Sequence, residues 1–129
     1  MAIEKKSYRS GPYADFIAEA VQVGNILYLS GQLGMDDEGN VADDLLAQVK
    51  QAYAGLKHVL AEFGATLDNV VDETFFVTDV EELMTNVEPI YAARQEAYGG
   101  LPEVAQTVIQ IGALVDPRCK IEIKCIAHL

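Results

Sequence analysis

The segment that decides the fold is DDLLAQVKQAYAGLKHVLAEF, residues 43–63. Its apolar residues recur at the three- and four-residue spacing of one helix face, which predicts a long amphipathic helix. Asp43 or Asp44 can cap its start, and Gly64 can end it in left-handed geometry. A stripe this long must pack on a broad apolar surface. The stripe consists of Leu45, Leu46, Val49, Ala52, Tyr53, Leu56, Val59, Leu60 and Phe63.

Strand signals lie on both sides of this helix. Residues 18–32 predict a β-hairpin that turns at Gly24-Asn25, because glycine in the first turn position suits a type II′ turn. The β-branched and aromatic residues of 70–78 predict a further strand. The segments 104–112 and 120–129 predict two more, which we expect to pair as a hairpin through Asp116-Pro117.

A second helical stretch covers about residues 80–98. Pro89 is expected to divide it, since proline is tolerated only in a first helical turn, and Asn86 is a candidate cap for the second piece. The predicted order is ββαβαββ, an α+β fold in a single domain over residues 1–129. Both main helices are expected on one face of a mixed sheet. The other face would expose apolar surface, so we expect it to be covered by oligomerisation.

Composition narrows the possible partners. Nine Lys and Arg against 20 Asp and Glu give a net charge of −11, which disfavours nucleic acid as a partner. No apolar run is long enough to span a membrane, and the N-terminal residues lack the apolar core of a signal peptide. Cys119 and Cys125 lie too far apart to pair within one strand, so two free thiols are expected. We therefore expect a cytoplasmic protein without membrane contact.

Several segments, taken in order, resemble the Rid (YjgF) family. They are Gly11-Pro12-Tyr13, VGNILYLSGQ at 23–32, the helix at about 48–63, TFFVTD at 74–79 and KIEIKCIA at 120–127. The resemblance covers nearly the whole chain. It implies a chorismate-mutase-like fold, a homotrimer with inward-facing sheets, and small-molecule clefts between subunits. Deaminating members of that family hydrolyse imines and enamines without a metal or an organic cofactor, so none is expected here.

The resemblance also carries site residues onto this chain. Glu122 corresponds to the glutamate that positions or activates the attacking water, and it is the expected catalytic residue. Ser30 and Gly31 correspond to the serine-glycine pair of the cleft, and Tyr13 to its tyrosine. The asparagine that precedes the last helix is replaced by Glu88 in one alignment, whereas a shifted alignment gives Asn86. A solvated strand residue is the competing interpretation of Glu122, because Lys120 and Lys124 share its alternation.

The chain departs from the family at the arginine that binds the substrate carboxylate. The family pattern there is Pro-Ala-Arg-Ser or Pro-Ala-Arg-Thr, and this chain reads PEVAQTV at 102–108. Gln106, followed by Thr107, is the best counterpart and belongs to the expected substrate-binding set. A neutral amide replaces a charged, two-pronged donor, so we predict weak binding of simple 2-imino acids. The three arginines of the chain, Arg9, Arg94 and Arg118, remain candidates to replace it.

Two functions stay open at this point. One is an enzyme that hydrolyses the C=N bond of an enamine or imine, with Glu122 acting on water. The other is a non-catalytic or regulatory trimer that binds a small ligand of another charge. Ribonuclease activity, assigned to some relatives, is disfavoured by the net charge.

Overall fold

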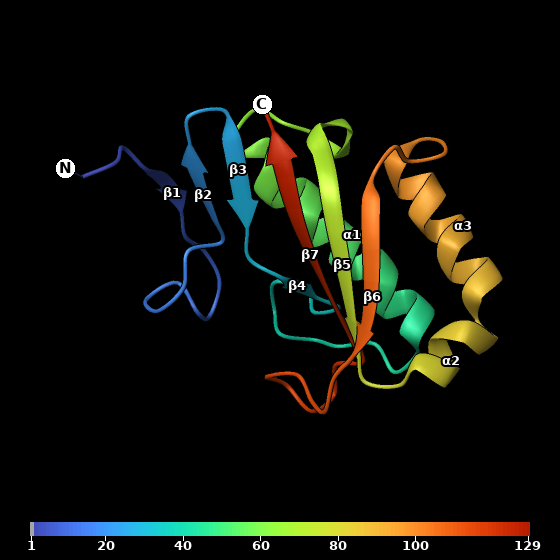
Figure 1. Ribbon diagram of the computed structural model, residues 1–129. Coiled ribbons are helices and arrows are strands. Elements are labelled where there is room, and N and C mark those ends of the chain that lie inside the picture. The colour runs from blue at the N-terminus through green and yellow to red at the C-terminus, as the bar shows by residue number, and fades with distance from the viewer. Residues whose placement is uncertain (1) are drawn as a thin grey trace.

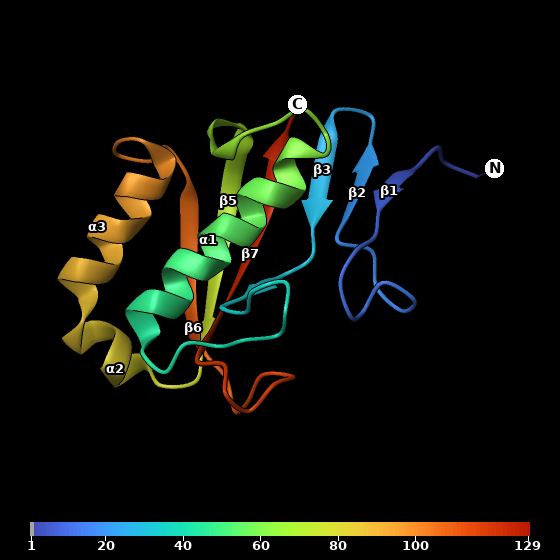
Figure 2. The same ribbon diagram turned by 180° about the vertical axis from the view of Figure 1, so that it is seen from behind.

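A computed structural model describes residues 2–129 as one mixed sheet with helices on a single face (Figures 1 and 2). The α+β prediction, with both main helices on one side, is confirmed. The strands are β1 (Lys6–Tyr8), β2 (Ala20–Val23), β3 (Ile26–Leu29), β4 (Gln32–Leu33), β5 (Val70–Val77), β6 (Ala105–Gln110) and β7 (Ile121–His128). The helices are α1 (Leu45–Ala61), the 3-10 helix η1 (Leu67–Asn69), α2 (Val80–Thr85) and α3 (Val87–Tyr98).

The sheet has the order β1-β2-β3-β7-β5-β6, and the short β4 also pairs with β7. The expected hairpin is present as β2 and β3, and its turn holds Gly24 at φ 58° with no positive φ at Asn25. All strand pairs are antiparallel except β5 with β6, which are joined through α2 and α3. The strands β1 and β4 were not predicted, because three and two residues are too short to show an alternation.

The hairpin predicted through Asp116-Pro117 is wrong. Strand β5 lies between β6 and β7 and pairs with both, so the segment 111–120 crosses the end of β5 instead of turning back beside it. Hydrogen bonds from Ile111 N to the Val77 carbonyl and from Thr78 N to the Lys120 carbonyl hold that crossing. The physical reason is that α3 returns the chain parallel to β5, and this places β6 at the outer edge.

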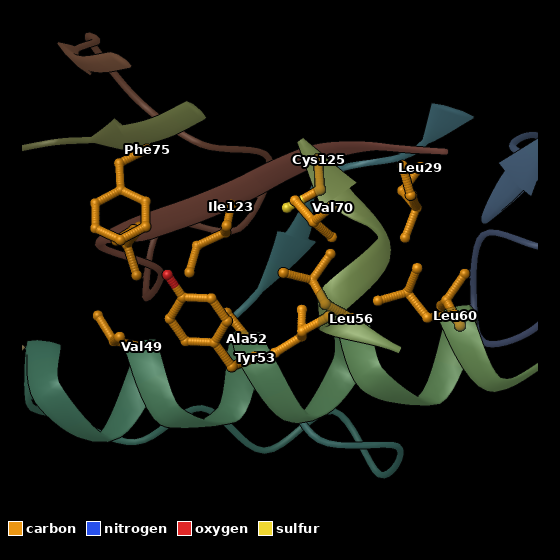
Figure 3. Close-up of a cluster of buried hydrophobic side chains, with 14 of the residues drawn as sticks. Leu29, Val49, Ala52, Tyr53, Leu56, Leu60, Val70, Phe75, Ile123 and Cys125 are labelled. Atoms are coloured by element: carbon orange, nitrogen blue, oxygen red, sulfur yellow. The ribbon is translucent and has the colours of Figure 1, made fainter. Parts of the chain in front are cut away.

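The long helix buries the predicted stripe against the sheet. Val49, Ala52, Leu56 and Leu60 are fully or almost fully buried, and they meet side chains that descend from the central strands (Figure 3). Gly64 takes φ 70° just past the helix, as predicted. Burial of this face is the main stabilising term of the fold, at roughly 1.5–3 kcal/mol for each large apolar side chain.

The start of α1 gives a first testable prediction. Asp44, not Asp43, is the cap, and its carboxylate accepts a hydrogen bond from Ala47 N at 2.8 Å. Replacing Asp44 by alanine should lower the free energy of unfolding by about 1 kcal/mol. Chemical denaturation at fixed protein concentration measures this. Asp43→Ala removes the same charge without a cap and should change stability by much less, so equal losses in both variants would contradict the assignment.

The second helical stretch is divided as predicted. Pro89 lies in the first turn of α3, and Asn86 occupies the position between the two helices. The Asn86 side chain, however, makes no capping hydrogen bond to α3; it donates to the Glu82 carbonyl at 2.8 Å. Gly99 ends α3 in left-handed geometry at φ 81°.

The face of the sheet away from the helices mixes apolar and polar side chains. Tyr28 and Ile109 are each 46% exposed there, although they belong to regular strands. Glu122 and Lys124 alternate on β7 with Ile121 and Ile123, which are buried toward the helices. The helix-free face of one chain therefore carries Glu122 and is open.

Candidate functional site

Glu122 lies directly against Gly31. Strand β4 pairs with β7 so that Leu33 is opposite Glu122, and this brings the residue before β4 to the same carboxylate. A methyl group built on Gly31 would approach Glu122 Oε1 to 2.3 Å, closer than any real side chain tolerates. Glycine is therefore required at position 31 for Glu122 to keep its place. The structure thus brings together two of the residues that the sequence singled out.

The environment of Glu122 favours its neutral form more than water does. Its side chain is half-buried on the helix-free face. Burial raises the pKa of the Glu122 carboxyl, and the positive charge of Lys124 opposes that rise. Lys124 is itself held by a hydrogen bond from Nζ to the Leu29 carbonyl at 2.9 Å. A carboxyl poised in this way can accept a proton from water and give it up again.

Ser30 does not point its hydroxyl at Glu122. Its Oγ donates to the Ala18 carbonyl at 2.6 Å, and its backbone N–H donates to the Glu19 carbonyl. The side chain of Ser30 therefore fixes the strand-to-loop transition that presents Gly31. Within one chain Ser30 thus has a positioning role. Only the lone pairs of its hydroxyl oxygen remain available to accept a hydrogen bond from a ligand.

A cavity of about 550 Å³ opens beside Gly31, between residues 10–13, β4 and α1. Tyr13 and Gly31 both line it, so the structure brings these two predicted residues to one site. Glu122 is not part of the lining; it lies behind Gly31, which touches both. The remaining lining residues are Ser10, Gly11, Pro12, Glu19, Gln32, Leu33, Met35, Asp36, Asp37, Gln51, Ala54, Gly55, His58 and Val59.

Gln106 lies on the other side of the sheet from Glu122. Its Nε2 donates to Glu73 Oε1 at 2.8 Å, and its Oε1 accepts from the Tyr91 hydroxyl at 2.7 Å. Glu73 is fully buried beneath the helices. Thr107, the next residue of β6, is exposed. Strand alternation places Thr107 on the helix-free face with Glu122, whereas the amide of Gln106 is already engaged.

The partner of Gln106 is the centre of a buried polar cluster that sequence reasoning missed. Glu73 accepts four hydrogen bonds, one from each of four different side chains. Burial, followed by the charge of Glu73, raises the pKa of both the Tyr53 and Tyr98 hydroxyls, so both stay protonated as donors. The four bonds come from Tyr53 Oη at 2.9 Å, Arg94 Nε at 2.8 Å, Tyr98 Oη at 2.7 Å and Gln106 Nε2 at 2.8 Å.

The family described as Endoribonuclease L-PSP, which is the Rid (YjgF) family, matches residues 8–129. The chain belongs to this family. It is 35% identical over 120 residues to the mouse (Mus musculus) protein named 2-iminobutanoate/2-iminopropanoate deaminase, a match that covers 91% of this chain and 81% of that one. It is also 32% identical over 110 residues to the RutC family protein YjgH of Escherichia coli, covering 85% of this chain and 80% of the relative.

Solved structures of Rid proteins share the fold. A structure described as a putative endoribonuclease L-PSP from Entamoeba histolytica superposes with a TM-score of 0.85 at 27% identity, covering 98% of this chain and all of the other. The YjgF gene product of E. coli gives a TM-score of 0.82 at 26% identity, covering 95% of this chain and 98% of that one. The predicted family and the predicted fold class are both confirmed.

Within this Rid chain, each of the three arginines makes at least one hydrogen bond of its own. Arg9 donates from Nη1 to the Ala14 carbonyl, and Arg118 binds Asp116 and the Gly39 carbonyl. Arg94 is paired with Glu73 and lies between the rings of Tyr91 and Tyr98. Burial works against the charge of Arg94, but its hydrogen bond to Glu73 and the charge of that carboxylate outweigh burial and raise the Arg94 pKa.

The two alternatives for the family asparagine lie at the junction of α2 and α3. Glu88 is exposed in the first turn of α3, and Asn86 is half-buried with its side chain donating to the Glu82 carbonyl. Neither lines the cavity beside Gly31. Among residues 2–129, no group of three or more His, Cys, Asp or Glu side chains is arranged to hold a metal ion. Within the same residues, no helix has the length and apolar character of a membrane span.

Proposed function

We propose that this Rid protein is a cytoplasmic homotrimer that hydrolyses the C=N bond of a small imine or enamine in clefts between subunits. The observation that carries the proposal is the half-buried carboxyl of Glu122, seated on the bare backbone of Gly31. The relative named as a 2-iminobutanoate/2-iminopropanoate deaminase supports the reaction class. The open sheet face, with Tyr28 and Ile109 exposed, supports assembly through that face.

The proposed chemistry needs only a base and water. Water adds to the electrophilic carbon of the protonated imine while the Glu122 carboxylate takes one of the protons of water, which gives a neutral carbinolamine. Glu122 then gives a proton to the carbinolamine nitrogen, the C–N bond breaks and ammonia leaves with the bonding electron pair, and the hydroxyl group loses its proton to solvent as the C=O bond forms. The net reaction converts one imine and one water into one carbonyl compound and one ammonia. The proton taken by Glu122 is returned, so the carboxylate is regenerated.

This chain should prefer substrates of a different charge from those of Rid proteins that keep the arginine. Gln106 carries no charge and is bonded to Glu73, and the three arginines already have partners. We therefore propose weak turnover of 2-imino acids and better turnover of imines that lack a carboxylate. Ammonia release from freshly generated 2-iminobutanoate and 2-iminobutane tests this, because methyl replaces carboxylate between the two. Faster release from 2-iminobutanoate would overturn the proposed preference, and no release from either would overturn the enzyme.

The pH dependence of the reaction follows from Glu122. The base form is the active form, so activity should fall as pH drops through the Glu122 pKa, which burial holds above its ordinary value of 4.5. Lys124 lowers that pKa, so Lys124→Gln should move the acid limb of the kcat/KM profile to higher pH. Lys120→Gln is the matched control, because Lys120 pairs with Glu82 instead. A limb that stays in place in Lys124→Gln would contradict the role of Glu122.

A non-catalytic trimer that binds a small ligand is the second candidate. It is favoured by one observation: Gln106, the counterpart of the family arginine, points beneath the helices and is bonded on both sides. If no imine is hydrolysed, thermal-shift measurements with anionic, neutral and cationic small metabolites test this second candidate. A metabolite that raises the melting temperature supports it. The net charge of −11 supports the absence of nucleic acid among the partners.

A further inference from the structure

The cavity beside Gly31 has a one-sided charge that the proposed reaction does not explain. Three carboxylates line it, from Glu19, Asp36 and Asp37, together with the His58 imidazole, whereas no lysine or arginine of residues 2–129 does. A cavity with this lining attracts cations and repels anions. Acidic side chains often serve only their own loops, so the contacts of each carboxylate decide its role.

One of the three carboxylates serves its own loop, and another is exposed to solvent. Asp36 Oδ1 accepts hydrogen bonds from the backbone N–H groups of Glu38 and Asn40, both at 2.9 Å, which closes the loop in which it lies. The Asn40 backbone donor is the main reason that the Asp36 pKa lies below its ordinary value. Asp37 is exposed to solvent. Neither is built to hold a ligand inside the cavity.

Glu19, in contrast, is held on its backbone and on one carboxylate oxygen. Its N–H donates to the Tyr8 carbonyl at 2.7 Å, and its carbonyl accepts from Ser30 N at 2.8 Å. Its Oε2 accepts from Gln32 Nε2 at 2.7 Å. Its Oε1 is neither buried nor hydrogen-bonded to any side chain or backbone group of residues 2–129. The fixed carboxylate therefore offers one free oxygen to the cavity.

Gln32, the residue that holds the Glu19 carboxylate, packs against the long helix α1. Gln32 lies against Gly55, where a methyl group would come within 2.7 Å of Gln32 Oε1. Glycine is unfavourable in a helix interior, so its presence here allows the close passage of the side chain that holds Glu19. No lysine or arginine pairs with Glu19 within the described chain. The negative charge of Glu19 is therefore balanced by no lysine or arginine of the described chain.

We infer that Glu19 makes this cavity a binding site for a small ligand with a protonated nitrogen, such as an alkylamine. Tyr13, 37% exposed, also lines the cavity, and aromatic rings attract cations. The site is separate from Glu122, and binding of an amine there does not require that any reaction takes place.

Isothermal titration calorimetry of the full-length protein with three four-carbon probes tests the inference. The probes are n-butylamine, 1-butanol and butanoate, which share a chain and differ in the charge of the head group. The wild-type protein should bind n-butylamine at least tenfold more tightly than butanoate, with 1-butanol between them. This comparison needs no variant. Equal or tighter binding of butanoate would overturn the inference.

Two variants locate the binding charge. Glu19→Gln keeps the shape of the side chain and should weaken n-butylamine binding at least tenfold while leaving 1-butanol unchanged. Glu38→Gln is the matched control, since Glu38 is exposed outside the cavity lining and its loss changes the net charge equally. It should change the n-butylamine affinity less than twofold. Equal losses in both variants, or no loss in Glu19→Gln, would overturn the assignment to Glu19.

A third variant separates this inference from the proposed function. Glu122→Gln should leave n-butylamine binding unchanged, because Glu122 does not line the cavity. If n-butylamine binds through Glu19 but no imine is hydrolysed, the amine site stands and the proposed enzyme fails. If 2-iminobutane is hydrolysed equally fast by wild type and Glu19→Gln, and n-butylamine does not bind, the enzyme stands and the amine site fails.

Discussion

Replacing Glu122 by glutamine should reduce kcat/KM for imine hydrolysis by roughly 10²–10⁴-fold, the range that a positioned general base contributes. Glutamine keeps the shape and the contact with Gly31 but cannot accept the proton of the attacking water. Ammonia release from 2-iminobutane measures the effect. Glu96→Gln is the control, because Glu96 is an exposed acid on the outer helix α3. A Glu122→Gln variant with wild-type activity would exclude this residue as the base.

Gly31→Ala tests the same carboxylate from its other side. The added methyl would meet Glu122 Oε1 and its neighbouring carbons within 2.3–2.7 Å, so the carboxylate must move. Gly31 has no positive φ, and alanine therefore brings steric displacement without backbone strain. The kcat/KM of Gly31→Ala for imine hydrolysis should fall as it does in Glu122→Gln, while the circular dichroism spectrum stays unchanged. An active Gly31→Ala enzyme would show that the place of Glu122 does not matter for the reaction.

Replacing Glu73 by glutamine should lower the free energy of unfolding by about 3–5 kcal/mol, the cost of leaving one member of a buried ion pair alone. Arg94 would lose its counterion, with Nη2 already buried and unpartnered. Two tyrosine hydroxyls and the Gln106 amide would also compete for a single carbonyl oxygen. Urea denaturation at fixed protein concentration measures the loss, since assembly couples stability to concentration.

The control for Glu73 lies one residue earlier on the same strand. Asp72→Asn removes the same charge from an exposed position and should change stability by less than about 0.5 kcal/mol. The double variant Glu73→Gln/Arg94→Gln removes both charges and should recover part of the loss. Equal stability of Glu73→Gln and wild type would show that the cluster is not a stabilising ion pair.

How far the sequence predicts this molecule depends on the range of the interactions. The stripe of 43–63 and the break at Pro89 are local patterns, and both are confirmed. The pairing of β6 with β5 instead of β7 depends on where α3 returns the chain, which no local pattern records. The Asp116-Pro117 loop predicts a hairpin only if strands that are neighbours in sequence are also neighbours in the sheet, and β6 and β7 are not.

The candidate site divides in the same way. Gly31 and Glu122 were found through family resemblance, and their contact follows from the pairing of β4 with β7. The Glu73 cluster was missed, although its signal was present: Glu73 alternates with Phe75 and Val77, so it falls on the buried face. Its partners come from three other elements, and only the tertiary fold shows that they converge.

The place of β7 has a consequence for how the protein is made. Residues 121–128 form the middle of the sheet, bonded to β3 and β4 on one side and to β5 on the other. Before these residues leave the ribosome, the nascent chain has only two separate pieces of sheet, and α1 has no complete surface to cover. Native structure must therefore wait for residues 121–128, when the central strand closes the gap between sheet pieces made earlier.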